Sequence, residues 1–327
     1  MTKTRVTIVG LGAIGCSLGL ALQRSGAEVE ITGHDKEPLA SRQAQKIGAV
    51  HKTHWNLISA CDGADLVVLA IPLQGIRDTL KALGGELRSG CVVTDTATVK
   101  TPVAAWAAES LPQGVYYVGG NPIVATEGAG ADAAKADLFQ EATWCVVSSA
   151  PASSDAIQLV TNVVTSCGAK PYFVDVYEHD GLLAATDHLP TVLAAALLKA
   201  VGASPALREM RKVGSQQLAV ATLPAWAEAA TSRDVCLLNQ ENILRWLEVM
   251  QATLREVHEL LAGGDEAQVG AFFEEARASW RQWQRGESAE TSEVSLSDVM
   301  PSMRSMLFGR LRSLDRPAGK KRSDDAP

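Results

Sequence analysis

Residues 5–22 read RVTIVGLGAIGCSLGLAL, and this stretch decides the fold. A short apolar run, Arg5 to Val9, leads directly into Gly10-Leu11-Gly12-Ala13-Ile14-Gly15. An apolar segment typical of a helix follows at once. The order of strand, G-x-G-x-x-G and helix is the fingerprint of a dinucleotide-binding unit and is more specific than the glycines alone. The sequence therefore predicts that the chain begins with a Rossmann-type domain.

Each glycine of this motif has a physical task. Gly10 permits the tight turn after the strand, Gly12 lets the backbone approach a pyrophosphate, and Gly15 lets the helix pack closely on the sheet. Ala13 and Ile14 open the helix, whose first N–H groups would face the phosphates. An alternative in which the glycines only form a turn leaves the flanking strand and helix unexplained.

The residue at the end of the second predicted strand indicates which dinucleotide is bound. Asp35 follows Ile31-Thr32-Gly33-His34 and places a carboxylate where a ribose 2′-hydroxyl would be bound. Lys36 could meet the 2′-phosphate of NADP, but the Asp35 carboxylate would repel that group, so NAD is the predicted cofactor. Further cofactor contacts are expected at Ile71, Pro72 and Asp95, although Pro72 could equally do no more than end its strand.

From residue 5 to about 176, short β-branched runs alternate with longer helix-like segments. This alternation predicts an α/β fold, a parallel sheet with helices on both faces. The runs are almost continuously apolar, as expected for strands that are buried on both faces. The predicted strands are Arg5–Val9, Val29–Thr32, Leu66–Ile71, Cys91–Thr94, Val115–Val118, Trp144–Ser148 and Tyr172–Val176.

After Asp175 the strand signals stop, and Ala/Leu-rich segments with a helical period take over. Their apolar surface is more than a helical domain of this size hides by itself, so the domain is expected to form a homodimer. The predicted helices are Asp180–Val201, Ala206–Ala221, Arg233–Leu261 and Glu266–Arg285.

These patterns divide the chain of 327 residues into three parts. Residues 1–177 form the predicted NAD-binding Rossmann domain, and residues 178–286 form an all-helical substrate and dimerisation domain. Residues 287–327 are rich in Ser, Glu, Asp, Arg, Lys and Pro and are predicted to be a disordered tail. Within the tail, Met300 to Leu311 could form a short apolar and basic helix that docks on the body or on a partner.

Composition narrows the class of partner. The net charge of -7 and the pI near 5.5 provide no broad basic field, so a small molecule is expected as the ligand and a nucleic acid is not. Six widely spaced cysteines without a C-x-x-C pair argue against a metal site and a disulfide scaffold. The N-terminus shows no secretion signal, and the apolar stretch Leu182–Val201 contains Asp187, His188 and Lys199, so a cytoplasmic protein without a membrane span is expected.

Three further stretches resemble the prephenate/arogenate dehydrogenase family. Asp95-Thr96-Ala97-Thr98-Val99-Lys100 is similar to its D-x-G-S-V-K segment. Gly119-Gly120-Asn121-Pro122-Ile123, with Thr126-Glu127, is similar to its G-G-H-P-M/I-x-G-T-E segment. His179-Asp180 and Asp187-His188-Leu189-Pro190 are similar to its H-D...S-H-L-P-H segment. The order and spacing of these stretches together make the resemblance specific.

The resemblance covers about residues 4–285 and implies an NAD-dependent enzyme of tyrosine biosynthesis. In that family a hydride leaves the ring carbinol of prephenate or arogenate, the ring carboxylate departs as carbon dioxide, and the product is aromatic. The resemblance also implies a serine-assisted histidine at the hydroxyl, a second histidine and an arginine for the substrate, and a dimer. Carried over to this sequence, the catalytic positions are Thr98, Asn121 and His188, and the substrate positions are Thr126, Glu127, Asp180, Asp187 and Thr191.

This sequence departs from the family pattern at several of these positions. Thr98 stands in place of the serine and keeps a hydroxyl. Asn121 stands in place of the histidine; its amide can orient a hydroxyl but has no basicity near neutral pH, which excludes proton transfer by this side chain. Asp187 and Thr191 replace the serine and the last histidine of the S-H-L-P-H segment.

His188 and Asp180 remain as the polar pair of the helical domain. On a helix the spacing through Ala184 places both near one face, so the carboxylate could set the tautomer of the imidazole or raise its pKa. Alternatively, His188 is a buried histidine that a backbone group satisfies. His179 is expected to cap the helix or face solvent. Thr126-Glu127 and the glycines that follow predict a loop over the pocket, or else a connection without catalytic contact.

Three functions therefore stay open. The first is a prephenate or arogenate dehydrogenase with an altered polar shell, and the second is an NAD-dependent dehydrogenase of another small carboxylate. The third is a non-catalytic NAD-binding dimer that senses the cofactor or regulates a partner. Three features separate these hypotheses: Asn121, Thr191 and the family's substrate arginine, which has no secure counterpart here although Arg211 and Arg233 are candidates.

Overall fold

A computed structural model describes residues 3–148, 153–214 and 216–285 of the chain. The described chain divides into two compact units, which meet between Leu247 and Glu248. The predicted tail, 287–327, and the helix expected within it at Met300–Leu311 lie outside the described residues.

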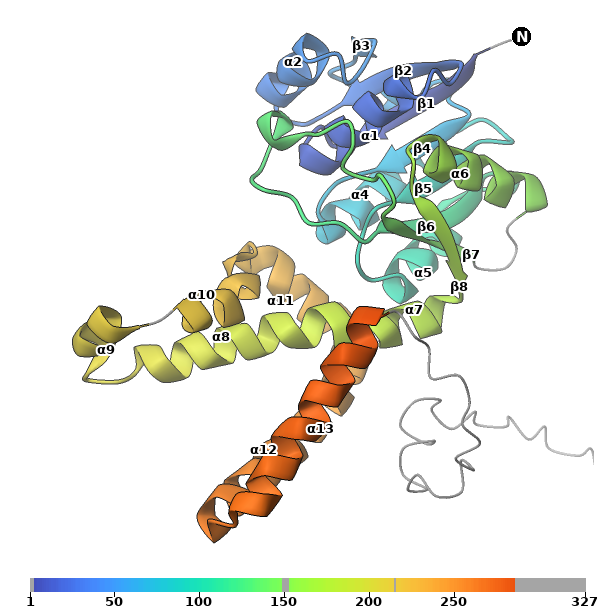
Figure 1. Cartoon of the computed structure of the whole chain (residues 1–327). Coiled ribbons are helices and arrows are strands. Elements are labelled where there is room, and N and C mark those ends of the chain that lie inside the picture. The colour runs from blue at the N-terminus through green and yellow to red at the C-terminus, as the bar shows by residue number, and fades with distance from the viewer. Residues whose placement is uncertain (1–2, 149–152, 215, 286–327) are drawn as a thin grey trace, which may run out of the picture. The chain divides into compact units, whose positions relative to one another are not determined.

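The first unit is built on an eight-stranded sheet (Figure 1). Its strands follow the order β3-β2-β1-β4-β5-β6-β7-β8, and the sheet is parallel except where β7 pairs with β6. All seven predicted strands are present, and β3 is an additional edge strand of two residues. The bounds are β1 Thr4–Val9, β2 Val29–His34, β3 Lys52–Thr53, β4 Leu66–Leu69, β5 Val92–Asp95, β6 Tyr116–Pro122, β7 Thr143–Ser148 and β8 Lys170–Val174.

The predicted parallel sheet is present, with one antiparallel pair, β6 and β7. A parallel pair needs a crossover connection, usually a helix, to return the chain to the same end of the sheet. Between β6 and β7 the chain forms only a short 3₁₀ turn, Ala131–Ala133, and therefore comes back antiparallel. β8 pairs parallel with β7 because α6, Ser154–Ser166, provides the crossover between them.

Helices cover both faces of the sheet, because successive strand residues point to opposite sides. Ile8 and Val68 belong to a core that also includes Leu18 of α1, whereas Val67 belongs to a second core that includes Ile76 of α4. The remaining helices of this domain have the bounds α1 Ala13–Arg24, α2 Pro38–Lys46, α3 Leu57–Cys61, α4 Leu73–Leu83 and α5 Thr101–Ser110.

After β8, every regular element of the described residues is a helix. Where one helix, Asp180–Val201, was expected, the structure has α7, Val176–Leu183, a π-helical turn, Ala184–His188, and α8, Leu189–Gly202. α7 begins early because the Asp175 carboxylate accepts the N–H groups of Tyr177 and Glu178 and caps it. The wide turn lies just before Pro190, which has no N–H to continue the helical ladder.

Of the three later predicted helices, two are interrupted once each, and the third, Glu266–Arg285, has the predicted bounds. The expected helix Ala206–Ala221 is two helices that flank Gly214, and the expected helix Arg233–Leu261 breaks at Asn239. The bounds are α9 Leu207–Val213, α10 Gln216–Thr222, a 3₁₀ turn Leu223–Trp226, α11 Ala229–Leu238, α12 Gln240–Gly263 and α13 Glu266–Arg285.

Among the described residues, Val176–Gly202 is long and apolar enough, by length and composition alone, to cross a membrane. The core helix of a soluble protein passes the same test. The buried polar residues His179, Asp180 and His188 lie in the first half of this stretch and form hydrogen bonds with other parts of the first unit.

Candidate active site

The glycine loop between β1 and α1 has the shape of a phosphate cradle. Gly10 has φ +96°, a conformation that favours glycine, and a Cβ there would collide with the carbonyl oxygen of Ala70. A Cβ on Gly15 would collide with the Gly10 carbonyl, so the helix packs tightly against the loop. At Gly12, in contrast, a Cβ would meet nothing within 4 Å. This open space lies at the N-terminus of α1, whose first turn carries no acidic side chain to oppose an anion.

Asp35 connects this loop to the end of β2. Its Oδ2 accepts the Leu11 N–H at 2.8 Å, and its Oδ1 accepts the Glu37 N–H at 2.8 Å. A carboxylate offers about four lone-pair sites, so two acceptor sites remain for ribose hydroxyls. The glycine loop and Asp35 therefore fit a dinucleotide such as NAD.

The other expected cofactor contacts differ in their surroundings. β4 ends at Leu69, two residues earlier than expected, and the Ile71 side chain lies against Gly10 of the glycine loop. Pro72 is exposed and precedes the first turn of α4. Asp95, in contrast, is fully buried, and its carboxylate is occupied by groups of the protein itself. The structure does not support a cofactor contact by this side chain.

Asp95 instead forms a buried ion pair with Lys100, which the sequence did not reveal. The Lys100 Nζ also donates to the Gly120 carbonyl at 2.7 Å, and the Tyr117 hydroxyl donates to the second Asp95 oxygen at 2.6 Å. Burial and the Asp95 charge hold the pKa of Tyr117 well above its usual value, which keeps it a donor. This cluster fastens the loop that carries Thr98 to the strand that carries Asn121.

Asn121 begins a second buried chain of hydrogen bonds. Its Nδ2 lies 3.0 Å from Nε2 of His179, and Nδ1 of His179 lies 2.9 Å from Oδ1 of Asp180. All three residues are buried. The prediction that His179 caps the helix or faces solvent was wrong, because Asp175 is the cap and His179 falls in the first turn, on its inward side.

Asp180 also holds the start of α5. Its two oxygens accept the N–H groups of Lys100 at 2.7 Å and Thr101 at 2.8 Å. Burial pushes the pKa of Asp180 upward, but the hydrogen bonds from His179, Thr101 and Lys100 outweigh it and leave the pKa below its usual value. The carboxylate is therefore an anion that joins the helical segment to the Rossmann domain.

His188 belongs to a neighbouring group. Its Nδ1 accepts from Nδ2 of Asn239 at 3.0 Å, and the same Nδ2 lies 2.8 Å from the Asp180 carbonyl. The Asp180 carboxylate was expected to set the tautomer of the His188 ring. Asn239, which the sequence did not single out, contacts the ring in its place. Burial lowers the pKa of His188, and the Asp187 and Asp180 charges do not offset it, so the ring is neutral. The Asp180 charge does act to raise this pKa, but burial outweighs it.

With Nδ1 as the acceptor, the neutral ring of His188 carries its hydrogen on Nε2. Among the described residues this buried nitrogen has no partner at hydrogen-bond distance, and Oδ2 of the exposed Asp187 lies 3.8 Å from it. The Thr98 backbone interacts with the ring and raises the pKa of His188 against the larger effect of burial, as expected for a buried histidine near a backbone group, and Thr98 itself is half-buried. A neutral donor next to the Thr98 loop can bind an oxygen of a ligand.

The other predicted substrate residues lie outside the buried cluster. Thr126 and Glu127 are exposed, and Glu127 pairs with Lys135 at 2.8 Å. Asp187 is exposed, and the Thr191 hydroxyl donates to its backbone carbonyl at 3.1 Å. Of the two candidate arginines, Arg211 lies on exposed α9 and Arg233 pairs with its neighbour Asp234.

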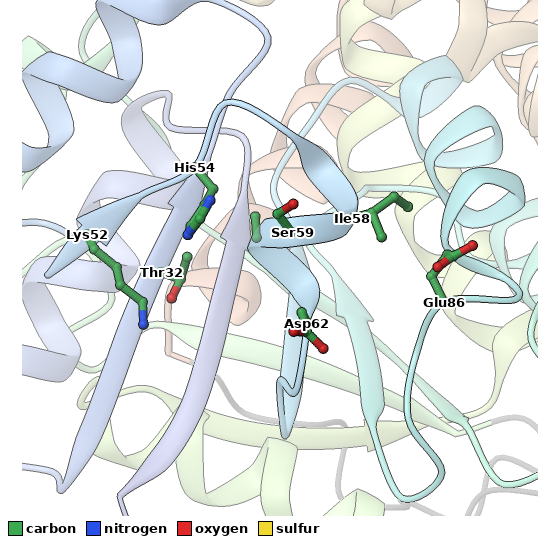
Figure 2. Close-up of a pocket in the computed structure, with 8 residues that line it drawn as sticks. Thr32, Lys52, His54, Ile58, Ser59, Asp62 and Glu86 are labelled. Atoms are coloured by element: carbon green, nitrogen blue, oxygen red, sulfur yellow. The ribbon is translucent and has the colours of Figure 1, made fainter.

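A cavity of about 500 Å³ lies elsewhere, beside β2, β3 and α3 (Figure 2). Figure 2 shows polar side chains around it, and none of them belongs to the predicted site. Its lining residues are Thr32, Lys52, His54, Ile58, Ser59, Ala60, Asp62 and Glu86.

Comparison with protein families decides which class of protein carries this site. The family model described as the nucleotide-binding domain of prephenate dehydrogenase matches residues 18–173, and the model described as its dimerization domain matches residues 175–275. The chain belongs to the prephenate dehydrogenase family. The first match begins after the glycine loop, so the geometry of that loop is an independent sign of nucleotide binding.

Relatives of this prephenate dehydrogenase family member are named for different substrates. Prephenate dehydrogenase of Lactococcus lactis subsp. cremoris is 27% identical over 280 residues, which cover 84% of this chain and 75% of the relative. A 4-amino-4-deoxyprephenate dehydrogenase of Streptomyces pristinaespiralis is 33% identical over 122 residues, 37% of this chain and 40% of the relative.

The fold is shared with a solved structure of the family. The prephenate dehydrogenase from A. aeolicus, solved with hydroxyphenyl propionate and NAD+, has a TM-score of 0.80 and 24% identity and covers 86% of this chain and 99% of its own. The family assignment makes the chain an oxidoreductase, and the nucleotide-binding domain supports NAD as its cofactor.

Proposed function

We propose that this protein catalyses the NAD-dependent oxidative decarboxylation of a cyclohexadiene carboxylate of the prephenate type, with prephenate and arogenate as the first substrates to test. In this reaction a hydride leaves the ring carbon that carries the hydroxyl, and the ring carboxylate leaves as carbon dioxide. The electrons of the broken C–C bond complete an aromatic ring, as tyrosine biosynthesis requires. The bound nicotinamide supplies the hydride acceptor.

The observation that carries this proposal is the buried group formed by Asn121, His179 and Asp180. It joins β6 to the helical segment and to the start of α5, next to the loop that carries Thr98. Polar side chains this deeply buried are costly unless they are paired, and they gather where a site needs fixed donors and acceptors.

The chain's own residues have separate tasks in this proposal. The glycine loop and Asp35 hold the dinucleotide. Thr98 and Asn121 orient the ring substituent, and Nε2–H of His188 donates to a substrate oxygen. No base acts at position 121, so the enzyme relies on alignment and on the electrons released by decarboxylation.

We also propose a cytoplasmic homodimer assembled through the helical domain. Large apolar side chains stand exposed there within the first unit, and the matching family model is a dimerization domain. They include Leu198, Val220, Leu223, Trp226 and Leu237. All six cysteines are unpaired, as a reducing compartment favours.

An assay separates this function from the other two. Purified protein with NAD is given prephenate, arogenate or the 4-amino analogue of prephenate, and reduced cofactor is followed by its absorbance. The 4-amino analogue is included because the Streptomyces pristinaespiralis relative bears that substrate in its name. Turnover of any of the three supports the proposal. Binding of NAD without turnover of any of them would leave another carboxylate, or a cofactor sensor, as the function.

A further inference from the structure

Two other side chains, His179 and Asp180, set the orientation of the Asn121 amide. Asp180 is ionised and accepts three N–H groups, so Nδ1 of His179 must carry the hydrogen that points at it. An amide nitrogen only donates, so Nε2 of His179 is the acceptor for Nδ2 of Asn121, which lies 3.0 Å away. Oδ1 of Asn121 is thereby the end of the amide that is turned away from His179.

This arrangement leaves an acceptor where the family has a base. The amide oxygen accepts a hydrogen bond but cannot take a proton near neutral pH. Its donation to His179, backed by the Asp180 charge, makes the oxygen a better acceptor, because hydrogen bonds in a chain polarise one another. The site thus binds and orients a donor group without deprotonating it.

The substituent on the reacting carbon decides whether a base is needed. Loss of hydride builds positive charge on that carbon, and a lone pair on its substituent must relieve it. A hydroxyl does this well only when a base draws on its proton, a contribution on the order of 10²- to 10⁴-fold. The lone pair of a neutral amine is a stronger electron donor and needs only an acceptor that orients its N–H bonds.

We propose that the natural substrate carries an amino group, in place of the hydroxyl, on the carbon that loses hydride. This inference rests on the proposed function and specifies the substrate of the same site. The substrate class is a 4-amino cyclohexadiene carboxylate, whose amine donates to Oδ1 of Asn121. His179 and Asp180 are positioning residues that hold this oxygen in place.

The reaction balances without a base. The ring C–H bond breaks and the hydride passes to the nicotinamide, which is reduced, while the C–C bond to the ring carboxylate breaks and its electron pair enters the ring. The products are an aromatic amine, carbon dioxide and reduced cofactor. The neutral amine keeps both protons; an ammonium form must first lose one proton to water.

The test compares the 4-amino analogue of prephenate with prephenate and arogenate on the full-length enzyme. We expect kcat/KM for the amine to exceed that for either hydroxyl compound by about tenfold or more, and to rise with pH toward the pKa of the substrate ammonium group. Equal or faster turnover of prephenate or arogenate would overturn the inference and leave the proposed function intact. Turnover of none of the three would overturn both.

Two variants make the test specific to this chain of hydrogen bonds. Asn121→His restores a base and should raise turnover of the hydroxyl compounds by about tenfold or more without raising that of the amine. His179→Gln frees the Asn121 amide to turn, so the preference for the amine should fall. The matched control is His54→Gln at an exposed histidine, which should leave the preference unchanged. A His179→Gln enzyme that keeps the full preference would contradict the positioning role.

Discussion

The Asp35 carboxylate contributes both to the shape of the glycine loop and, in our proposal, to cofactor binding. Asp35 accepts backbone N–H groups from Leu11 and Glu37, which fixes the glycine loop to the end of β2. The lone pairs that remain face a dinucleotide ribose in our proposal. Selection between NAD and NADP is therefore coupled to the shape of the phosphate cradle.

We expect the wild type to bind NAD much more tightly than NADP, because the Asp35 carboxylate repels a 2′-phosphate. Asp35→Ala removes this repulsion and should narrow the difference in affinity between NAD and NADP. It should also weaken the binding of both cofactors, because the glycine loop loses its contact with Asp35. Titration of both cofactors on both proteins measures this, and Glu37→Ala, which leaves the Glu37 N–H in place, is the control. Equal affinity of the wild type for the two cofactors would refute the assignment.

The parts of the site that are contiguous in the sequence could be predicted. The contacts that the fold makes between distant residues could not. The glycine loop is a continuous motif, and its roles follow from six neighbouring residues. The contact of Asp180 with the Lys100 N–H joins residues 80 positions apart, and no spacing rule gives it. His179 was misplaced because the cap at Asp175, which turns it inward, was not recognised.

At the scale of elements, two buried carboxylates hold the junction between α5 and α7. Asp180 on α7 accepts the N–H groups of Lys100 and Thr101, so an anion stands at the N-terminus of α5, where the helix dipole favours it. Lys100 is meanwhile held by Asp95 through its side chain. Asp180 thus binds the backbone N–H of Lys100, and Asp95 binds its side-chain ammonium.

This junction predicts a pH dependence of stability. The folded-state pKa of Asp180 lies below its ordinary value of 3.8, so the ionised carboxylate stabilises the fold above that pH. The stabilisation is lost as the pH falls through the folded-state pKa. Asp180→Asn should lower the free energy of unfolding by about 3 kcal/mol near neutral pH and by less in acid, as denaturant titrations would show. Asp187→Asn at an exposed carboxylate is the control, and an equal loss at both pH values would contradict this account.

The strands and helices could be predicted where their apolar residues form a continuous run or a regular period. Buried parallel strands read as apolar runs, and all seven were found. β3 has only two residues, too few for a pattern, and the direction of β7 depends on the connection that precedes it rather than on its own residues. The predicted helices ending at Ala221 and Leu261 are interrupted at Gly214 and Asn239, whereas the predicted helix Asp180–Val201 is continuous and only widens into a π-helical turn before Pro190.

For the whole molecule, the exposed apolar side chains of the helical segment point to a second copy of the chain. We expect a homodimer by light scattering at micromolar concentration, and removal of residues 287–327 should leave it intact. Trp226→Glu places a charge on the exposed apolar surface and should weaken the dimer, whereas Trp55→Glu, at an exposed tryptophan of the Rossmann domain, should not. A monomeric wild type would show that this surface serves another purpose.

The central claim is that hydride transfer and decarboxylation occur together on a ring substrate. The most direct measurement follows reduced cofactor and released carbon dioxide in the same reaction, with the purified full-length enzyme, NAD and each of the three cyclohexadiene carboxylates in turn. We predict one carbon dioxide for each cofactor reduced, together with an aromatic product, for at least one of them. Cofactor reduction without release of carbon dioxide, or NAD binding with no reduction by any of the three, would contradict the account.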